Sequence, residues 1–80
     1  MPRLKVVSGD YVIKQLTKFD FIIVGQAGSH VKIQRYYAEE KQTLTIPLHK
    51  ELDRGLTKAI YNQALKYLSE QELRKIFYTD

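Results

Sequence analysis

The sequence predicts an α+β fold in which helices cover one face of an antiparallel three-stranded sheet. Two kinds of hydrophobic spacing lead to this prediction. Apolar residues recur at helical spacing in residues 9–18, 56–66 and 70–77, and they alternate with polar residues in 30–37 and 42–48. A short apolar run separates the first helix from the first alternating segment. The expected order of elements is therefore one helix, three strands and two helices.

The first predicted helix begins after Ser8. A serine at this position caps free backbone amides, and Asp10 places a negative charge near the positive end of the helix dipole. Apolar residues at helical spacing follow: Val12, Ile13, Leu16 and Phe19. The segment Phe21-Ile22-Ile23-Val24 is aromatic and β-branched, which predicts a first strand that ends between Val24 and Gln26.

A tight turn is expected between the first two strands. Gly28 takes a positive φ angle without steric cost, and the second strand is expected over residues 30–37. A polar loop over residues 38–41 then leads to the third strand, 42–48. On this strand we expect Leu44, Ile46 and Leu48 to face the core, and Thr43, Thr45 and Pro47 to face away from it.

Two helices complete the predicted fold. The first follows Gly55 over residues 56–66, and its expected buried stripe is Leu56, Ala59, Ile60 and Ala64. The second is short, residues 70–77, and begins with a capping box. In this motif Ser69 accepts from the Glu72 amide, and the Glu72 side chain reaches back to the Ser69 amide. This helix is expected to bury Leu73, Ile76 and Phe77.

Composition restricts the classes of function. The chain has eighty residues and no cysteine, so disulfides, thiolate metal sites and cysteine nucleophiles are excluded. A chain this short builds one core, and we expect a single domain over residues 1–80. The longest apolar run is far too short to span a bilayer, and the first residues lack the apolar stretch of a secretory signal. We therefore expect a cytoplasmic protein without membrane contact.

The positive charge is unevenly distributed along the chain. Residues 1–50 contain eight Lys or Arg against four Asp or Glu, whereas residues 51–80 contain five of each. A positive field attracts polyanions by steering and by counterion release. Charge alone does not separate this interpretation from that of an ordinary solvated basic surface.

The second strand carries the candidate active site. Successive side chains of a strand point to opposite faces, so His30, Lys32, Gln34 and Tyr36 share one face, and Val31, Ile33 and Arg35 share the other. At about 3.3 Å of rise per residue, His30 and Lys32 lie roughly 7 Å apart on the wet face. A titratable imidazole beside a fixed cation makes a suitable site for a phosphodiester group to bind.

Four phrases of the sequence resemble a known family when they are taken together. They are Val7-Ser8-Gly9 at the first helix, Gln26-Ala27-Gly28-Ser29-His30 at the turn, Ile46-Pro47-Leu48-His49-Lys50-Glu51-Leu52 before Gly55, and Ala59-Ile60-Tyr61-Asn62-Gln63-Ala64 in the following helix. In this order and spacing the chain resembles the HicA (YcfA-like) toxins over roughly residues 3–77.

The resemblance implies a fold and an activity. It implies the αβββα fold of double-stranded-RNA-binding domains, here followed by a short C-terminal helix. It also implies a small ribonuclease that cuts mRNA and is silenced by a HicB-type antitoxin, with His30 as the catalytic histidine. The family commonly has a basic residue about two positions before the turn, where this chain has Gly25.

RNA cleavage of this kind needs no metal, because the 2′-OH next to the cut bond attacks the phosphorus once a base takes its proton. The unperturbed pKa of histidine, about 6.5, suits it to act as general base or acid. Lys32 is the nearest cation, and the expected RNA contacts are Ser29, Lys32, Gln34, Arg35 and Tyr36. We expect no metal or cofactor, since two histidines without a ligand motif make a poor metal site.

Two other functions remain open from the sequence. A non-catalytic RNA-binding module on the same fold uses Lys32, Arg35 and Tyr36 to hold RNA, and His30 is then incidental. A protein-interaction domain is the second alternative. His49 also has two interpretations, as a residue that stabilises its loop through a hydrogen bond or as a second acid or base.

Overall fold

A three-stranded antiparallel sheet forms one layer of the molecule. The structure is a computed structural model that describes residues 2–79. Strands β2 (Ile22–Ala27), β3 (His30–Tyr37) and β4 (Glu40–Pro47) lie in the order β2-β3-β4, so that β3 is central. Both neighbouring pairs are antiparallel, as the sequence predicts.

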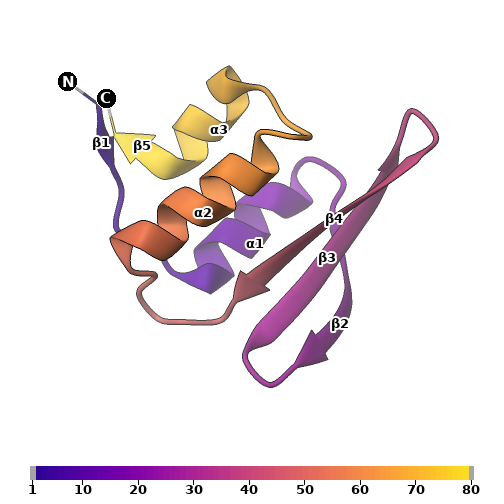
Figure 1. The fold of residues 1–80 in the computed structure, drawn as a ribbon, viewed down its shortest axis with the longest axis horizontal. Helices are drawn as coiled ribbons and strands as arrows, with labels where there is room; N and C mark the ends of the chain where they lie inside the picture. Colours follow the sequence, from indigo (N-terminus) through magenta and orange to yellow (C-terminus); the bar gives the residue numbers. More distant parts are fainter. Residues whose placement is uncertain (1, 80) are drawn as a thin grey trace.

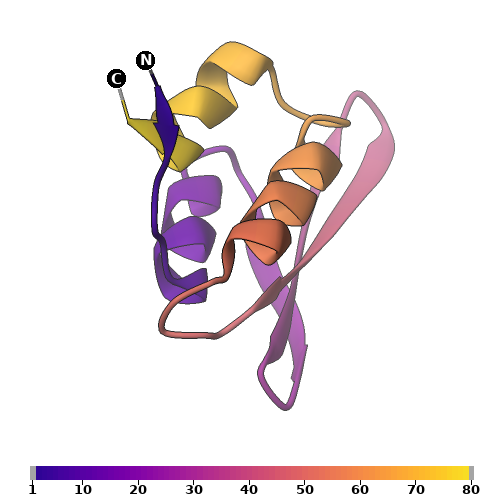
Figure 2. The ribbon, with the colours of Figure 1, turned by 60° about the vertical axis from the view of Figure 1, so that its left-hand side comes forward.

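Helices form a second layer against one face of this sheet (Figures 1 and 2). Helices α1 (Gly9–Thr17) and α2 (Arg54–Ala64) both pack on β4, and α3 (Glu70–Phe77) packs on α2. The fold is therefore α+β with the αβββα order of double-stranded-RNA-binding domains and one further helix. No helix within residues 2–79 is long and apolar enough to cross a bilayer.

Each helix begins with a side chain that caps its first turn. Ser8 accepts a hydrogen bond from the Tyr11 amide at 3.0 Å, and Asp53 accepts one from the Leu56 amide at 2.7 Å. At α3 the predicted capping box is present: the Ser69 and Glu72 side chains each accept from the other residue's backbone amide. Such caps satisfy amides that have no partner inside the helix.

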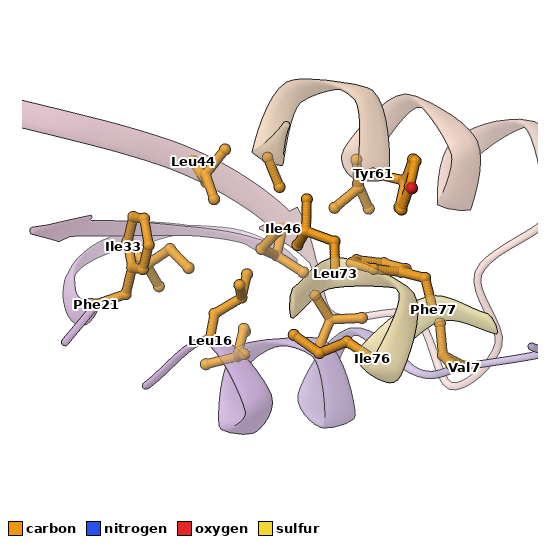
Figure 3. Close-up of a cluster of buried hydrophobic side chains, with 14 of the residues drawn as sticks. Val7, Leu16, Phe21, Ile33, Leu44, Ile46, Tyr61, Leu73, Ile76 and Phe77 are labelled. Carbon is orange, nitrogen blue, oxygen red and sulfur yellow. The ribbon is translucent and has the colours of Figure 1, made fainter. Parts of the chain in front are cut away.

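The core lies between the inner face of the sheet and the helices. Figure 3 shows Ile33, Leu44 and Ile46 of the sheet facing Leu16 of α1 and the apolar residues of α3. The buried residues predicted for α3 are confirmed, with Leu73, Ile76 and Phe77 all inaccessible or nearly so. Val31 and Ile33 likewise point inward from β3, so the predicted alternation of this strand is confirmed.

A two-stranded sheet near the two ends of the chain was not expected. Strand β1 (Arg3–Leu4) pairs antiparallel with β5 (Tyr78–Thr79). The amide of Lys5 extends this contact by donating to the carbonyl of Phe77 at 2.7 Å. Two-residue strands leave no period-2 pattern to detect, so the sequence contains no signal for them.

The loop between β3 and β4 is shorter than predicted. The polar loop expected over residues 38–41 is a two-residue turn, Ala38-Glu39, and β4 starts at Glu40. Both turn residues have positive φ angles, 52° and 65°, which match the right-handed twist of the strands but are usually reserved for Gly, Asn or Asp. Because the sequence has none of these residues at positions 38 and 39, it predicts a longer loop than the one observed.

The end of β4 also differs from the prediction. Pro47 is buried and Leu48 is 38% exposed, the reverse of the expectation. The first turn of α1 lies directly on this segment: a Cβ placed on Gly9 would overlap the carbonyl oxygen of Pro47. The packing of α1 thus decides which of these two residues is buried, and the alternation of residues along the strand does not predict this packing.

Helix α2 starts at Arg54, two residues earlier than predicted, and its buried stripe is Thr57, Ile60, Tyr61 and Ala64. The prediction was right for Ile60 and Ala64 and wrong for Ala59, which is exposed, and for Leu56, which is only partly buried. Tyr61 is inside because its ring packs edge-on against Phe77 and Tyr78, with centroids 5.6 and 5.4 Å away. Edge-to-face aromatic pairs have a preferred geometry, so these contacts help to set the orientation of α2 against the C-terminal segment.

Strand β2 is an exposed edge. Phe21, just before it, is 1% exposed and fills the core, but all six residues of the strand are exposed. Ile22 and Ile23 are 62% and 59% exposed. The pairing with β3 shifts register between Ile23 and Gly25, so Val24 forms a bulge.

Candidate active site

His30 is held at one end of the sheet by the turn between β2 and β3. Gly28 has the predicted positive φ angle, 58°, and its carbonyl accepts from the Gln26 side chain at 3.0 Å. The carbonyl of Ser29 accepts from the amide of Leu48 at 2.6 Å, which ties the turn to the end of β4. The imidazole of His30 therefore projects from a well-anchored backbone, and its residue is exposed.

A hollow of about 340 Å³ lies beside His30 on the sheet face that the helices do not cover. Its walls are His30 and Lys32 of β3, Thr45 of β4 and the segment Val24–Ala27 of β2. The bulge in β2 shapes this wall, because two residues there, Val24 and Gly25, lie opposite the single residue Lys32. A Cβ on Gly25 would meet no atom within 4 Å, so the hollow is open at that point.

The lining of the hollow is cationic. It contains Lys32 and His30, and none of its residues is Asp or Glu. Within the described part of the chain, neither side chain takes part in a hydrogen bond or ion pair with the protein. Both are exposed, and their donors therefore remain available for the oxygens of a bound phosphate.

The other predicted site residues lie along the same open face, with one exception. Ser29 is exposed in the turn, Gln34 is half-buried in mid-strand, and Tyr36 is 75% exposed near the far end of β3. The pairing of Gln34 with Ile22 on one side and Thr43 on the other places it between the hollow and Tyr36. Gln34 and Tyr36 do not line the hollow itself.

Arg35 is the exception, and the expectation that it contacts RNA is corrected. Its residue is 8% exposed and its guanidinium donates to the Gln42 side chain at 2.6 Å and to the carbonyls of Phe19 and Tyr67 at 2.9 and 3.0 Å. The same group lies over the rings of Phe21 and Tyr37, 4.9 and 4.7 Å from their centroids. Arg35 joins four segments of the protein, and its side chain lies on the face of the sheet that the helices cover.

Several residues of the hollow and of the open face were not predicted as site residues. Gln26 and Thr45 line the hollow, and Lys41 pairs across the sheet with Tyr36. The parity of the third strand already placed Thr45 on the open side, so that signal was present. Lys41 was assigned to a loop and not to β4, because the short Ala38-Glu39 turn contains no glycine or asparagine that would have indicated a two-residue turn.

His49 lies outside the hollow and is exposed. Its backbone carbonyl accepts from the amide of Gly9 at 3.0 Å, whereas its ring makes no hydrogen bond with residues 2–79. A hydrogen bond to the main chain of His49 thus ties the loop to α1, and the alternative role of this residue as a second acid or base stays a prediction. No three His, Cys, Asp or Glu side chains of the described chain are grouped as metal ligands would be.

Comparison with protein families identifies the relatives of this site. The family described as the HicA toxin of bacterial toxin–antitoxin systems matches residues 9–65, from the start of α1 to the end of α2. This chain belongs to the HicA toxin family. Neither a curated protein nor a solved structure matches it. The matched region includes the turn, His30 and the whole hollow, so the open face lies within the part shared with other HicA toxins.

Proposed function

We propose that this HicA toxin is a metal-independent endoribonuclease that cuts mRNA at the hollow beside His30. The observation that carries the proposal is the placement of an exposed imidazole and an exposed ammonium group, His30 and Lys32, in one open hollow without an acidic side chain. Both belong to the region matched by the toxin family. An mRNA substrate places the action of the toxin in the cytoplasm.

The proposed reaction uses a nucleophile that belongs to the substrate. The 2′ oxygen attacks the adjacent phosphorus as its proton passes to a base, and the 5′ oxygen of the next nucleotide leaves and takes up a proton. The products are a 2′,3′-cyclic phosphate and a 5′ hydroxyl. His30 serves as the general base or acid of this exchange, and Lys32 stabilises the charge that develops on the phosphorane oxygens.

The remaining contacts hold the RNA. Ser29 and Gln34 donate hydrogen bonds from the turn and from mid-strand, and Tyr36 offers an exposed ring to a base. A HicB-type antitoxin silences the toxin by covering this positive face. Nothing in the proposed reaction requires a metal or a cofactor, because no external nucleophile has to be activated.

The decisive test compares the two histidines of the chain. Cleavage of labelled RNA and growth after induction are measured for His30→Ala and for the matched control His49→Ala, which removes the exposed histidine outside the hollow. We expect His30→Ala to lose about 10²–10⁴-fold in cleavage rate, and His49→Ala to remain active. Equal cleavage and equal growth arrest by His30→Ala and the parent would overturn the proposal.

Two further results separate the proposal from its alternatives. Retention of RNA without any 2′,3′-cyclic phosphate product identifies a binding module on the same fold. Activity that disappears in EDTA and returns with a divalent ion contradicts the metal-independent reaction.

Gly25→Lys provides a gain-of-function variant, because its Cβ meets no atom and the new ammonium group reaches the hollow beside Lys32. We expect this variant to bind RNA more tightly and with a steeper salt dependence.

A further inference from the structure

The open face extends well beyond the hollow. Along β3 the side chains of His30, Lys32, Gln34 and Tyr36 follow one another on this face, each two residues after the last. Their partners on β4 complete the surface: Thr45 lies opposite Lys32, Thr43 opposite Gln34 and Lys41 opposite Tyr36. The surface therefore begins at the reacting histidine and ends at an aromatic ring beside a cation.

The repeat along this surface is regular. Two residues of a strand advance by about 7 Å, so Tyr36 lies roughly 20 Å from His30 along β3. One such step is comparable to the advance of one nucleotide in an extended single strand. A strand of RNA laid along β3 with its cut phosphate at His30 and Lys32 thus brings the third nucleotide beyond that phosphate to Tyr36.

The far end of this surface has the chemistry of a nucleotide subsite. Tyr36 is 75% exposed, and Lys41, its cross-strand partner, is exposed as well. Cross-strand partners hold their Cβ atoms about 5 Å apart, so the ring and the ammonium group project side by side. The nearby acidic residue Glu40 pairs with Tyr37, which places it on the opposite face, and its carboxylate accepts from Gln42. Glu39 lies in the turn.

The position of this subsite makes it reachable. The hairpin of β3 and β4 extends past the helices as a projecting ribbon, with the Ala38-Glu39 turn at its tip (Figures 1 and 2). Tyr36 and Lys41 form the second cross-strand pair from that turn. No other element of the described chain approaches the open face there closely enough to make the ring buried.

From these observations we infer that the toxin takes single-stranded RNA along β3, and that Tyr36 and Lys41 form a distal subsite about three nucleotides from the cut bond. Tyr36 stacks on an unpaired base, and Lys41 contacts a backbone phosphate. Stacking of this kind needs a base that is free of a duplex, because bases in an A-form helix are already stacked and their major-groove edges are inaccessible. This inference rests on the proposed cleavage at His30.

Binding measurements with oligoribonucleotides test the subsite independently of cleavage. Homopolymers of increasing length are bound to His30→Ala, the variant expected to cut them too slowly to disturb a binding measurement. We expect the affinity to rise with length until the oligomer reaches about five nucleotides. In this background Tyr36→Ala lowers the affinity for that oligomer about tenfold and leaves the affinity for a dinucleotide unchanged, since only the longer oligomer has a base that stacks on the Tyr36 ring.

Matched variants distinguish the subsite from general effects. Tyr37→Ala removes the neighbouring ring, which faces the other side and stacks on Arg35, and it is expected to leave the length dependence in place. Lys41→Gln is expected to reduce the salt slope of binding by about one ion, whereas Lys18→Gln, at the end of α1, is expected to leave the slope unchanged. Circular dichroism confirms that each variant is folded.

The outcomes separate this inference from the proposed function. Equal loss of dinucleotide and longer-oligomer binding in Tyr36→Ala, no loss at all, or equal binding of a blunt duplex and a single strand each overturn the subsite. Cleavage by the parent without length dependence overturns the subsite and leaves the proposed activity intact. Length dependence in a protein that never cuts RNA overturns the activity and leaves the single-strand surface intact.

Discussion

Lys32 and Arg35 lie three residues apart on β3 and face opposite sides of the sheet. Lys32 is exposed on the open face and makes no hydrogen bond or ion pair with the described chain. Arg35 is 8% exposed, and three of its nitrogens donate to groups on three other segments. The two residues carry the same charge, but only Lys32 keeps its charge available for a ligand.

The difference between these cations reflects the two faces of the whole sheet. The covered face satisfies its polar groups within the protein, so a residue there contributes to stability. The open face leaves its donors exposed, so a residue there is free to act on a ligand. Variants of the two faces should therefore separate into those that change stability and those that change RNA binding or cleavage.

The largest effect is expected from Arg35→Met. This change leaves the side chain of Gln42 without its donor in a buried position, and the carbonyls of Phe19 and Tyr67 without theirs in partly buried positions. An unsatisfied buried group costs about 1–3 kcal/mol, and we expect the free energy of unfolding to fall by about 3 kcal/mol. Chemical denaturation followed by circular dichroism measures it.

Lys32→Met is the matched variant on the other face. We expect its free energy of unfolding to stay within about 0.5 kcal/mol of the parent, while RNA binding weakens and becomes less salt-dependent. If Lys32→Met were as unstable as Arg35→Met, or if Arg35→Met kept full stability, the assignment of stability to the covered face and of RNA binding to the open face would be contradicted.

An intermediate effect is expected from Gly9→Ala, where α1 meets β4. The new Cβ would overlap the carbonyl of Pro47, so the backbone of one element must move. Overpacking of this kind costs about 1–3 kcal/mol. Gly25→Ala, on the open side, meets no atom within 4 Å and is expected to change stability by less than about 0.5 kcal/mol. Thermal unfolding of the pair distinguishes them, and equal losses would contradict the predicted clash.

The smallest effect concerns Glu72 in the capping box of α3. Hydrogen bonds from the amide and hydroxyl of Ser69 lower the pKa of this carboxyl group below its ordinary value of 4.5. The folded protein therefore favours the carboxylate, and the resulting stabilisation is complete above pH 4.5 and is lost as the pH falls through the lowered pKa. The free energy of unfolding falls as the pH falls, and we expect this fall to be smaller in Glu72→Gln than in the parent, by less than about 1 kcal/mol. RNA cleavage is expected to be unchanged.

Stability curves measured from pH 6 to pH 2 test this prediction. An unchanged acid profile in Glu72→Gln would show that the carboxylate does not contribute in the expected way. Altered RNA cleavage at neutral pH in the same variant would instead show that the helical layer and the open face are not independent.

Much of the fold could be predicted because it depends on local patterns. The Ser8 cap marks the start of α1, the capping box marks α3, and strict alternation sets the two faces of β3. The exposed position of His30 followed from that alternation together with the Gly28 turn. Each of these features involves residues that are close in the sequence.

Most failures of prediction involve contacts between distant segments, whereas the short Ala38-Glu39 turn was missed for a local reason, the unusual residues at its positive φ angles. Arg35 belongs to the buried parity of β3, yet as a charged residue it was also assigned to RNA; the acceptors that hold it lie 16 and 32 residues away along the chain. Thr57 and Tyr61, and not Leu56 and Ala59, lie in the buried stripe of α2. Tyr61 is buried because the helix packs against aromatic residues of the C-terminal segment.

The sequence by itself determined the three helices, the three strands of the larger sheet, their order and the face of β3 on which His30 and Lys32 lie, since helical and strand periodicity are properties of neighbouring residues. Only the tertiary structure decided that Arg35 is buried and held by three hydrogen bonds, that β2 bulges beside the hollow, and that Lys41 lies beside Tyr36. These outcomes depend on register and on layer packing, where interactions between remote residues outweigh local preference.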